Sequence, residues 1–162
     1  MPRATLETTL QLAGAGTGDL SMNFREKSAW LNVLAMLAAY SLYFGLIIAG
    51  HPAGREIFPM LWLFGSIALA HAAIVIVGTI ILSARAPKSE RVRADERDRA
   101  IRRRGATIAY YVLLAGMMVV GVYLPFVEQG VPLANTGLFA IVLAELVNSA
   151  VVLISYRRGW HG

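Results

Sequence analysis

Four long apolar runs dominate this chain and limit what it can fold into. They cover residues 29–49, 57–83, 106–127 and 132–155, and none of them contains Lys, Arg or Asp. A helix of about 20 residues crosses the hydrocarbon core of a bilayer, because each residue adds about 1.5 Å to a path of about 30 Å. Each run reaches this length. We therefore predict an all-α integral membrane protein, a four-helix bundle whose single domain covers residues 23–159.

The composition agrees with this prediction and leaves little room for a soluble domain. The 162-residue chain is 57% hydrophobic and 15% charged, whereas charged residues make up about a quarter of a typical soluble domain. Residues 1–22 carry isolated leucines between polar residues and lack the apolar core of a secretory signal. We expect these residues to form a disordered N-terminal tail.

A hydrophilic segment, residues 85–104, separates the second apolar run from the third. It holds nine Lys or Arg and four Asp or Glu. Asp95 precedes Arg99 by four residues and Asp98 precedes Arg102 by four, which predicts ion pairs along a charged helix over 85–105 that continues into the third span. The residues of this predicted cytoplasmic helix that form a candidate interaction surface are Arg91, Arg93, Asp95, Glu96, Arg97, Asp98, Arg99, Arg102, Arg103 and Arg104. They are either a solvated face that sets topology or a docking surface for anionic lipid headgroups or a protein partner.

Positive charge falls almost entirely on one side of the four predicted spans. The two terminal flanks and the hydrophilic segment hold fourteen Lys or Arg, and the loops on the other side hold Arg55 alone. Loops rich in Lys and Arg remain in the cytoplasm. We therefore predict a multi-pass protein of the bacterial inner membrane with both termini in the cytoplasm.

Two ionisable side chains lie deep inside the apolar runs. His71 in the second span and Glu145 in the fourth fall at nearly the same depth, close to the bilayer midplane. Asn148 and Ser149 follow Glu145 by three and four residues and share its helix face. A carboxylate at this depth is unfavourable unless it is neutral, hydrated or paired. These four residues form either a Glu145–His71 proton relay or cation site, or a structural contact that fixes helix register.

Other residues of the spans are predicted to pack helices together. Asn32, near the start of the first span, is expected to form an interhelical hydrogen bond. Gly45, Gly116 and Gly121 would let helices approach closely, within the bundle or at a homodimer face. Similar residues recur 71 or 74 positions apart, which suggests a tandem repeat of helical hairpins about an axis along the membrane normal.

Several functional classes are excluded by residue type. The chain has no cysteine, and therefore no disulfide, thiol nucleophile or cysteine metal site. It shows no metal-spaced His cluster, Gly-rich phosphate loop or Ser/His/Asp set. No aromatic residue is interleaved with the arginines, as it would be in a single-stranded nucleic-acid site. We expect no metal, no cofactor, no nucleic-acid partner and no enzymatic activity.

Two functional hypotheses follow. In the first, the protein has a structural, regulatory or accessory role within the lipid bilayer, acting through self-association or through a cytosolic or membrane protein partner at its charged helix. In the second, it is a small proton- or cation-coupled transporter or channel that uses Glu145 and His71. A water-filled path to Glu145 would favour transport, whereas a dry core closed around a Glu145–His71 contact would favour a structural role.

Three short segments resemble an uncharacterised family of small bacterial membrane proteins. They are MNFREKSAW before the first span, ADERDRAI before the third and LAELVNSA in the fourth, and the tail Tyr156-Arg157-Arg158 is also similar. The resemblance implies four transmembrane helices, a DERD-type motif before the third of them and no established activity. It also implies a basic residue where this chain has Asn148, so a Glu–Arg pairing does not carry over.

Overall fold

The structure, a computed structural model of the chain, describes residues 24–86 and 96–158. Its four long helices are α2 (Phe24–Ile48), α3 (Ile57–Arg85), α4 (Glu96–Met118) and α5 (Val131–Arg157). Three short helical turns accompany them: η1 (Pro52–Arg55), the π-helical η2 (Val119–Tyr123) and η3 (Leu124–Phe126). The predicted N-terminal tail and residues 87–95 of the predicted charged helix lie outside the described residues.

All four helices are long and apolar enough to cross a membrane, the third of them as the segment Asp98–Phe126 that includes η2 and η3. The described residues contain no strand. The predicted all-α fold is therefore confirmed, with four helices that are able to span a membrane. Of the four apolar runs, only residues 49 and 127 fall outside these helices, in the turns that follow them.

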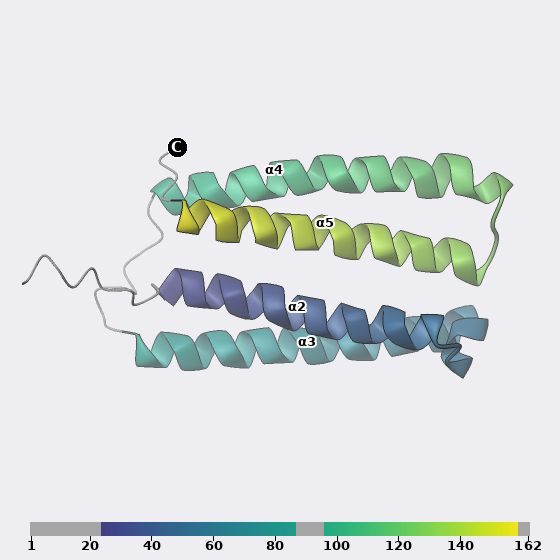
Figure 1. Cartoon of the computed structure of the whole chain (residues 1–162), viewed down its shortest axis with the longest axis horizontal. Helices are drawn as coiled ribbons and strands as arrows, with labels where there is room; N and C mark the ends of the chain where they lie inside the picture. Colours follow the sequence, from purple (N-terminus) through teal and green to yellow (C-terminus); the bar gives the residue numbers. More distant parts are fainter. Residues whose placement is uncertain (1–23, 87–95, 159–162) are drawn as a thin grey trace, which may run out of the picture.

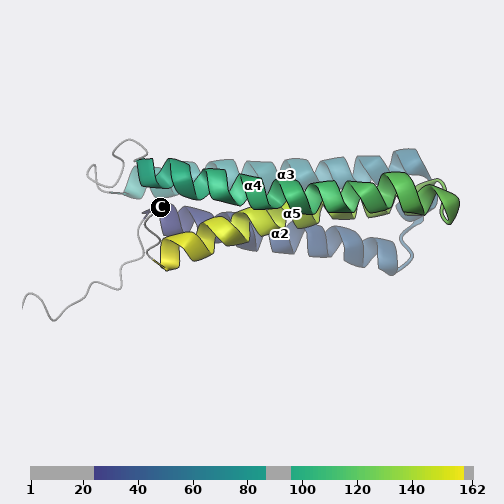
Figure 2. The same ribbon diagram turned by 90° about the horizontal axis from the view of Figure 1, so that it is seen from above.

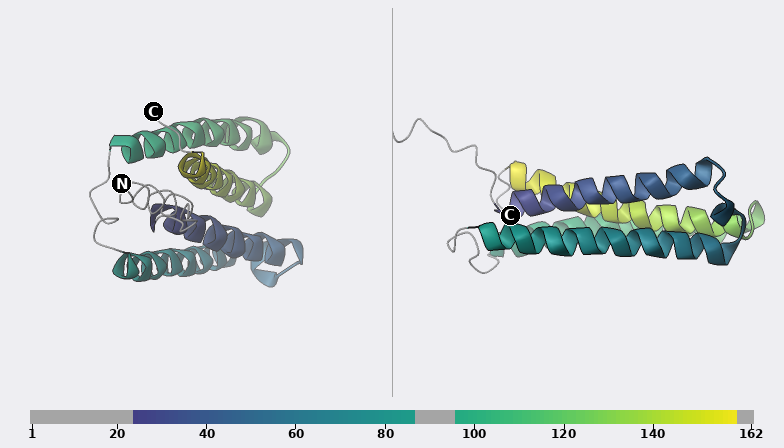
Figure 3. Two further views of the ribbon diagram at one scale, coloured as in Figure 1. Left: turned by 60° about the vertical axis from the view of Figure 1, so that its left-hand side comes forward. Right: turned by 90° about the horizontal axis from the view of Figure 1, so that it is seen from below.

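The helices lie side by side in the order α4, α5, α2, α3 (Figure 1). The starts of α2 and α4 and the ends of α3 and α5 meet at one end, which we call the charged end, and the hairpin turns lie at the other, the turn end. The view from above and an oblique view show that the row is curved, with α2 and α5 in the middle and α3 and α4 at its two edges (Figures 2 and 3). The main packing pairs are α4–α5, α2–α3 and α2–α5.

This order does not have the two-fold symmetry that a tandem repeat of hairpins would give. Such an axis would exchange α2 with α4 and α3 with α5, so contact between α2 and α5 would be matched by contact between α3 and α4. In the described residues, α2 packs on α5 while α3 and α4 form no comparable interface. The helices are arranged as an open arc.

Glycines with positive φ begin or end the turns at the turn end. Gly50, after α2, has φ +81°, and Gly130, before α5, has φ +64°, a region that residues with a Cβ rarely adopt. The His51 Nδ1 atom accepts a hydrogen bond from the Ala53 N–H at 3.2 Å and caps η1. Each turn therefore reverses the chain within a few residues and returns it antiparallel.

Aromatic packing joins α2, α3 and α5 toward the turn end. Tyr43 of α2 is fully buried, with its ring centroid 5.1 Å from that of Phe64 in α3. Its hydroxyl donates a hydrogen bond to the Asn135 Oδ1 atom of α5 at 3.0 Å. Phe44, next to it, packs edge-on against Phe139 of α5. These contacts hold α2 in the middle of the arc.

Close approach between helices occurs at some of the expected glycines and not at others. A Cβ added to Gly116 of α4 would lie 2.8 Å from the Ala140 Cβ of α5, which confirms this position as a close contact. At Gly45 and Gly121 an added Cβ would meet nothing within 4 Å, so neither glycine makes a close contact within the described part of the chain, and a role of either at a homodimer face stays a prediction. The close contact on α3, Gly78 against Leu31, was not singled out from sequence.

Candidate functional site

A buried carboxylate links three helices at the charged end. Asp98, in the first turn of α4, is 3% exposed. Its Oδ2 atom pairs with the Arg25 guanidinium of α2, and its Oδ1 atom accepts a hydrogen bond at 3.2 Å from the Tyr156 hydroxyl of α5. A carboxylate removed from water needs such partners, because its lost hydration must be replaced. We call Arg25, Asp98 and Tyr156 the Asp98 clasp.

A second, more exposed set of contacts ties α2 to α5 beside the clasp. The Arg157 Nε atom lies 3.7 Å from the Glu26 Oε1 atom, and the Arg157 guanidinium lies 6.0 Å from the ring centroid of Trp30. The Arg157 side chain is 62% exposed, so solvent weakens both interactions. These contacts orient the ends of the two helices and contribute little to stability.

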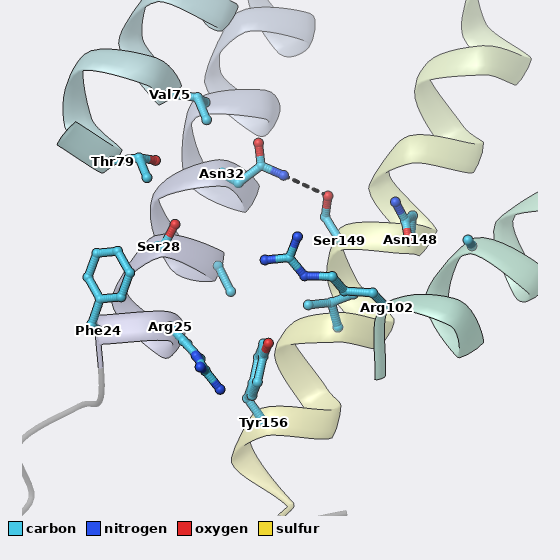
Figure 4. A pocket seen from close by; sticks show the side chains of 13 residues that line it. Phe24, Arg25, Ser28, Asn32, Val75, Thr79, Arg102, Asn148, Ser149 and Tyr156 are labelled. Carbon is cyan, nitrogen blue, oxygen red and sulfur yellow. Dashed lines mark hydrogen bonds between the residues drawn. The ribbon is translucent and has the colours of Figure 1, made fainter. Parts of the chain in front are cut away.

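The clasp corrects the expected pairing of Asp98 with Arg102. The two residues are four apart on α4, yet the carboxylate pairs with Arg25 of another helix. Asp98 is buried toward α2 and α5, while Arg102 is exposed and extends from α4 into the space between those helices (Figure 4). No hydrogen bond or ion pair engages Arg102 among the described residues. The buried Asp98 carboxylate therefore pairs with Arg25 of α2, whose side chain is partly buried, and not with Arg102, which is exposed on the same helix.

Arg102 lines a cavity of about 510 Å³ at the charged end, to which all four helices contribute. We call it the polar cavity (Figure 4). It is lined by Phe24, Arg25, Ser28, Ala29, Asn32, Val75, Thr79, Arg102, Ala106, Asn148, Ser149, Val152 and Tyr156. Hydrogen-bonding side chains therefore come from every helix, and small residues between them leave room for a ligand.

A hydrogen bond between α2 and α5 crosses one wall of this cavity. The Asn32 Nδ2 atom donates to the Ser149 Oγ atom at 2.9 Å, which confirms the interhelical hydrogen bond expected of Asn32. One amide N–H of Asn32 and the hydroxyl hydrogen of Ser149 are not used in this bond. Asn148 adds a further amide to the lining. The wall thus presents several donors near Arg102.

The charge balance of the polar cavity is positive. Arg25 is compensated by Asp98, whereas Arg102 has no acidic residue beside it among the lining residues. Amide, hydroxyl and guanidinium donors together favour an oxyanion over a cation, because they all present N–H or O–H groups. A carboxylate or phosphate group is the chemistry that this arrangement can accept.

Two of the four intramembrane residues singled out from sequence lie in the polar cavity, and two do not. Asn148 and Ser149 line it. Glu145, about one turn deeper on α5, is exposed at the surface of the protein. The His71 Nε2 atom is buried without a hydrogen-bond partner among the described residues. No hydrogen bond or ion pair joins Glu145 to His71, because α2 packs between most of α3 and α5.

Tyr40 of α2 is a neighbour of His71. Its ring centroid is 5.6 Å from that of His71, with the rings edge-on, and the charge of Glu145 acts on it electrostatically. No hydrogen bond among the described residues links Tyr40 with His71 or Glu145 into a relay. Metal binding has no support there, because no group of three His, Asp or Glu side chains in the described residues is arranged to hold an ion.

The charged residues before the third span differ in how far the structure describes them. Arg91, Arg93 and Asp95 lie outside the described residues, and Arg97 belongs to α4. The exposed members of the first turns of α4 are Glu96, Arg99, Arg102, Arg103 and Arg104. The helix that carries them runs without a break into the third span. Its arginines thus stand at the edge of the membrane domain.

Arg25, Ser28, Thr79 and Tyr156 were not singled out as site residues from sequence. Each lies within two turns of the charged end of its helix, as polar residues at an interface commonly do. Their position near helix ends is a signal available from sequence. Their convergence on one cavity depends on helix order and rotation, which that signal does not contain.

The comparisons with known proteins agree with the fold. The family model described as Predicted membrane protein (DUF2178) matches residues 36–160. No curated protein and no solved structure matches the chain significantly. The matched segment covers the second half of α2 and the whole of α3, α4 and α5, which confirms the resemblance to an uncharacterised family of membrane proteins. The chain belongs to the family of predicted membrane proteins DUF2178.

Proposed function

We propose that this protein is a non-enzymatic membrane protein with a regulatory or accessory role, acting at the cytoplasmic face of the bacterial inner membrane through its charged end. The observation that carries the proposal is the Asp98 clasp. It fixes three helices to one another where α4 leaves the membrane. Because the Asp98 clasp holds the start of α4 against α2 and α5, the arginines of α4 keep a fixed arrangement. A partner with complementary charge can recognise such an arrangement.

Arg99 and Arg103 are the residues through which we expect a partner to bind. They are four positions apart on one face of α4, and both are exposed. The proposed partner is a protein with an acidic surface, or a second copy of this chain. Acid–base chemistry has less support, because the buried carboxylate at this end is already engaged by Arg25 and Tyr156.

Site-specific photo-crosslinking in native membranes tests this function. A photoreactive residue would be placed at Arg99 or Arg103, and in a matched control at Tyr111, which is 64% exposed on the membrane-spanning part of α4. We expect discrete protein adducts from the two arginine positions and none from Tyr111. An adduct of twice the chain mass would identify self-association. Equal adduct formation at all three positions, or none at the arginines, would refute the proposal.

A second candidate function is proton- or cation-coupled transport through the Glu145–His71 region. It is supported by the His71 Nε2 atom, which is buried and has no hydrogen-bond partner among the described residues, and by the Tyr40 ring beside it. An unsatisfied polar atom inside a membrane protein is unfavourable and is retained where it has a use. Proton and cation flux into proteoliposomes would be compared for the wild type and Glu145→Gln, which keeps the shape but removes titration. Flux that the substitution abolishes would establish transport, and absence of flux in both would exclude it.

A further inference from the structure

We propose that the polar cavity binds the phosphate of an anionic phospholipid, with Arg102 as its ion partner and one acyl chain lying along α3. This inference goes beyond the regulatory function proposed above and does not depend on a protein partner. It rests on the depth of the cavity, on its charge and on its position next to an apolar groove.

The depth of the cavity suits a lipid headgroup. Arg102 lies four residues before Ala106, where the third apolar run begins, and Tyr156 directly follows the fourth run. Both residues line the cavity and belong to the interface between headgroups and hydrocarbon. Basic pockets between helices at the cytoplasmic side of a membrane are recurrent sites for anionic headgroups.

The charge of the cavity selects an anionic headgroup over a neutral one. Arg102 supplies a guanidinium that no described residue engages, and a guanidinium binds phosphate oxygens through paired hydrogen bonds. Asn32, Asn148 and Ser149 offer further donors around the same space. A zwitterionic headgroup would add a cation beside Arg102 without an acidic residue in the lining to receive it.

An apolar groove on α3 lies next to the cavity. It is lined by Val75, Ile76, Thr79, Ile80, Ser83 and Ala84. Val75 and Thr79 line the polar cavity as well, so the two spaces share a wall. A ligand that fills both must be polar at one end and apolar at the other.

The arrangement of the helices gives an acyl chain a way out of the bundle. In the described residues, α3 and α4 form no extensive interface, and they stand at the two edges of the arc (Figure 3). Two of the four helices that line the cavity, α3 and α4, are therefore not packed extensively against each other. An acyl chain can pass between them to the α3 groove and remain continuous with the surrounding bilayer.

Binding of phosphatidylglycerol and phosphatidylcholine to the full-length protein tests the site. Native mass spectrometry after delipidation in detergent would measure the apparent Kd for each lipid, using wild type, Arg102→Gln and Arg103→Gln. The two substitutions remove the same charge from adjacent exposed positions of α4, and Arg103 is outside the cavity lining. We expect wild type to prefer phosphatidylglycerol and Arg102→Gln to bind it about fivefold more weakly, the factor that one basic residue contributes. Arg103→Gln should bind as wild type does.

Three results would overturn the proposal. The first is equal binding of phosphatidylglycerol and phosphatidylcholine to the wild type. The second is an equal loss of phosphatidylglycerol affinity in Arg102→Gln and Arg103→Gln. The third is displacement of phosphatidylglycerol by glycerol 3-phosphate at a concentration equal to that of the lipid. The last would make the ligand a soluble phosphate. Failure of crosslinking at Arg99 would leave these measurements untouched, so the lipid site and the protein partner are tested separately.

A second pair of variants tests the apolar part of the site without changing charge. Thr79→Trp would fill the wall that the cavity and the groove share, and Ile74→Trp adds the same side chain to an exposed position of α3 outside both linings. We expect Thr79→Trp to weaken phosphatidylglycerol binding and Ile74→Trp to leave it unchanged. Unchanged binding in a well-folded Thr79→Trp protein would rule out the acyl-chain path. Thermal unfolding of each variant in the same detergent reports whether it is folded.

Discussion

Arg25 and Asp98 are 73 residues apart in the chain, and their ion pair joins the first described helix to the third at the charged end. The contact closes the arc from α2 to α4, two helices that are separated in the row by α5. Tyr156 of α5 completes it by donating to the other oxygen of the same carboxylate. The buried carboxylate of Asp98 thus holds together the end of the molecule where the proposed partner surface and the proposed lipid site lie.

Replacing Arg25 with Gln should destabilise the protein substantially. The substitution leaves the Asp98 carboxylate buried without its ion partner, and removal of one member of a buried pair costs about 3–5 kcal/mol. Because the Arg25 side chain is 31% exposed, we expect a loss near the lower end, about 3 kcal/mol. The free energy of unfolding in mixed SDS micelles measures it.

The matched control for this prediction is Glu26→Gln. It removes the neighbouring ion pair with Arg157, whose oxygen and nitrogen are 3.7 Å apart and partly exposed, so we expect a loss below about 1 kcal/mol. The double variant Arg25→Gln/Asp98→Asn should recover part of the stability, because neither buried charge then remains. Equal effects of Arg25→Gln and Glu26→Gln would mean that the clasp is not a stabilising contact.

The fold could be predicted from this sequence because it depends on features that are local in the chain. Runs of about 20 apolar residues specify membrane-spanning helices wherever they occur. Asn32 is a polar side chain within such a run, and it needs a hydrogen-bond partner from the protein, because a membrane interior supplies no water to bond it. Its hydrogen bond was therefore predictable, although the identity of the partner, Ser149, was not.

The site could be predicted only in part, because it depends on helix order and rotation. The rise of 1.5 Å per residue gives depth, and it places His71 and Glu145 at similar levels. It does not give the direction in which each side chain points, nor which helix separates the two. Close contacts such as Gly116 against Ala140 set that rotation. The spacing rule for charges on one helix failed for Asp98 for the same reason, since it contains no information about Arg25.

Gly116→Ala should destabilise the protein, although alanine is the better helix former. The added Cβ would lie 2.8 Å from the Ala140 Cβ, and overpacking of this kind costs about 1–3 kcal/mol. Gly45→Ala is the matched control, because a Cβ there meets nothing within 4 Å, and it should be neutral or stabilising by up to about 1 kcal/mol. Unfolding in mixed micelles compares the two. Rescue of Gly116→Ala by Ala140→Gly would assign the effect to this contact, and failure of rescue would assign it elsewhere.

The Asn32–Ser149 hydrogen bond should show a modest coupling energy. Interhelical hydrogen bonds in membrane proteins average about 0.6 kcal/mol and reach about 1.7 kcal/mol, and we expect a value in this range. A double-mutant cycle of Asn32→Leu and Ser149→Ala measures it. Thr136→Ala serves as the control partner, because its hydroxyl donates to the Pro132 carbonyl oxygen of its own helix, and its coupling to Asn32→Leu should be near zero. A zero coupling for Ser149 as well would show that the contact adds no stability.

The orientation of the chain determines which membrane face carries the polar cavity and the arginines of α4. The absence of cysteine allows a direct test, because a single introduced cysteine is the only thiol in the protein. Arg99→Cys places it at the charged end and Glu56→Cys at the turn end, both at exposed positions. The fourteen-to-one distribution of Lys and Arg predicts that the charged end faces the cytoplasm.

A membrane-impermeant maleimide added to cells with a permeabilised outer membrane should then label Glu56→Cys at once and Arg99→Cys only after lysis. Labelling of Arg99→Cys before lysis would place the polar cavity and the partner surface on the outer side of the membrane. Neither a cytosolic partner nor an anionic lipid of the cytoplasmic leaflet could reach them there.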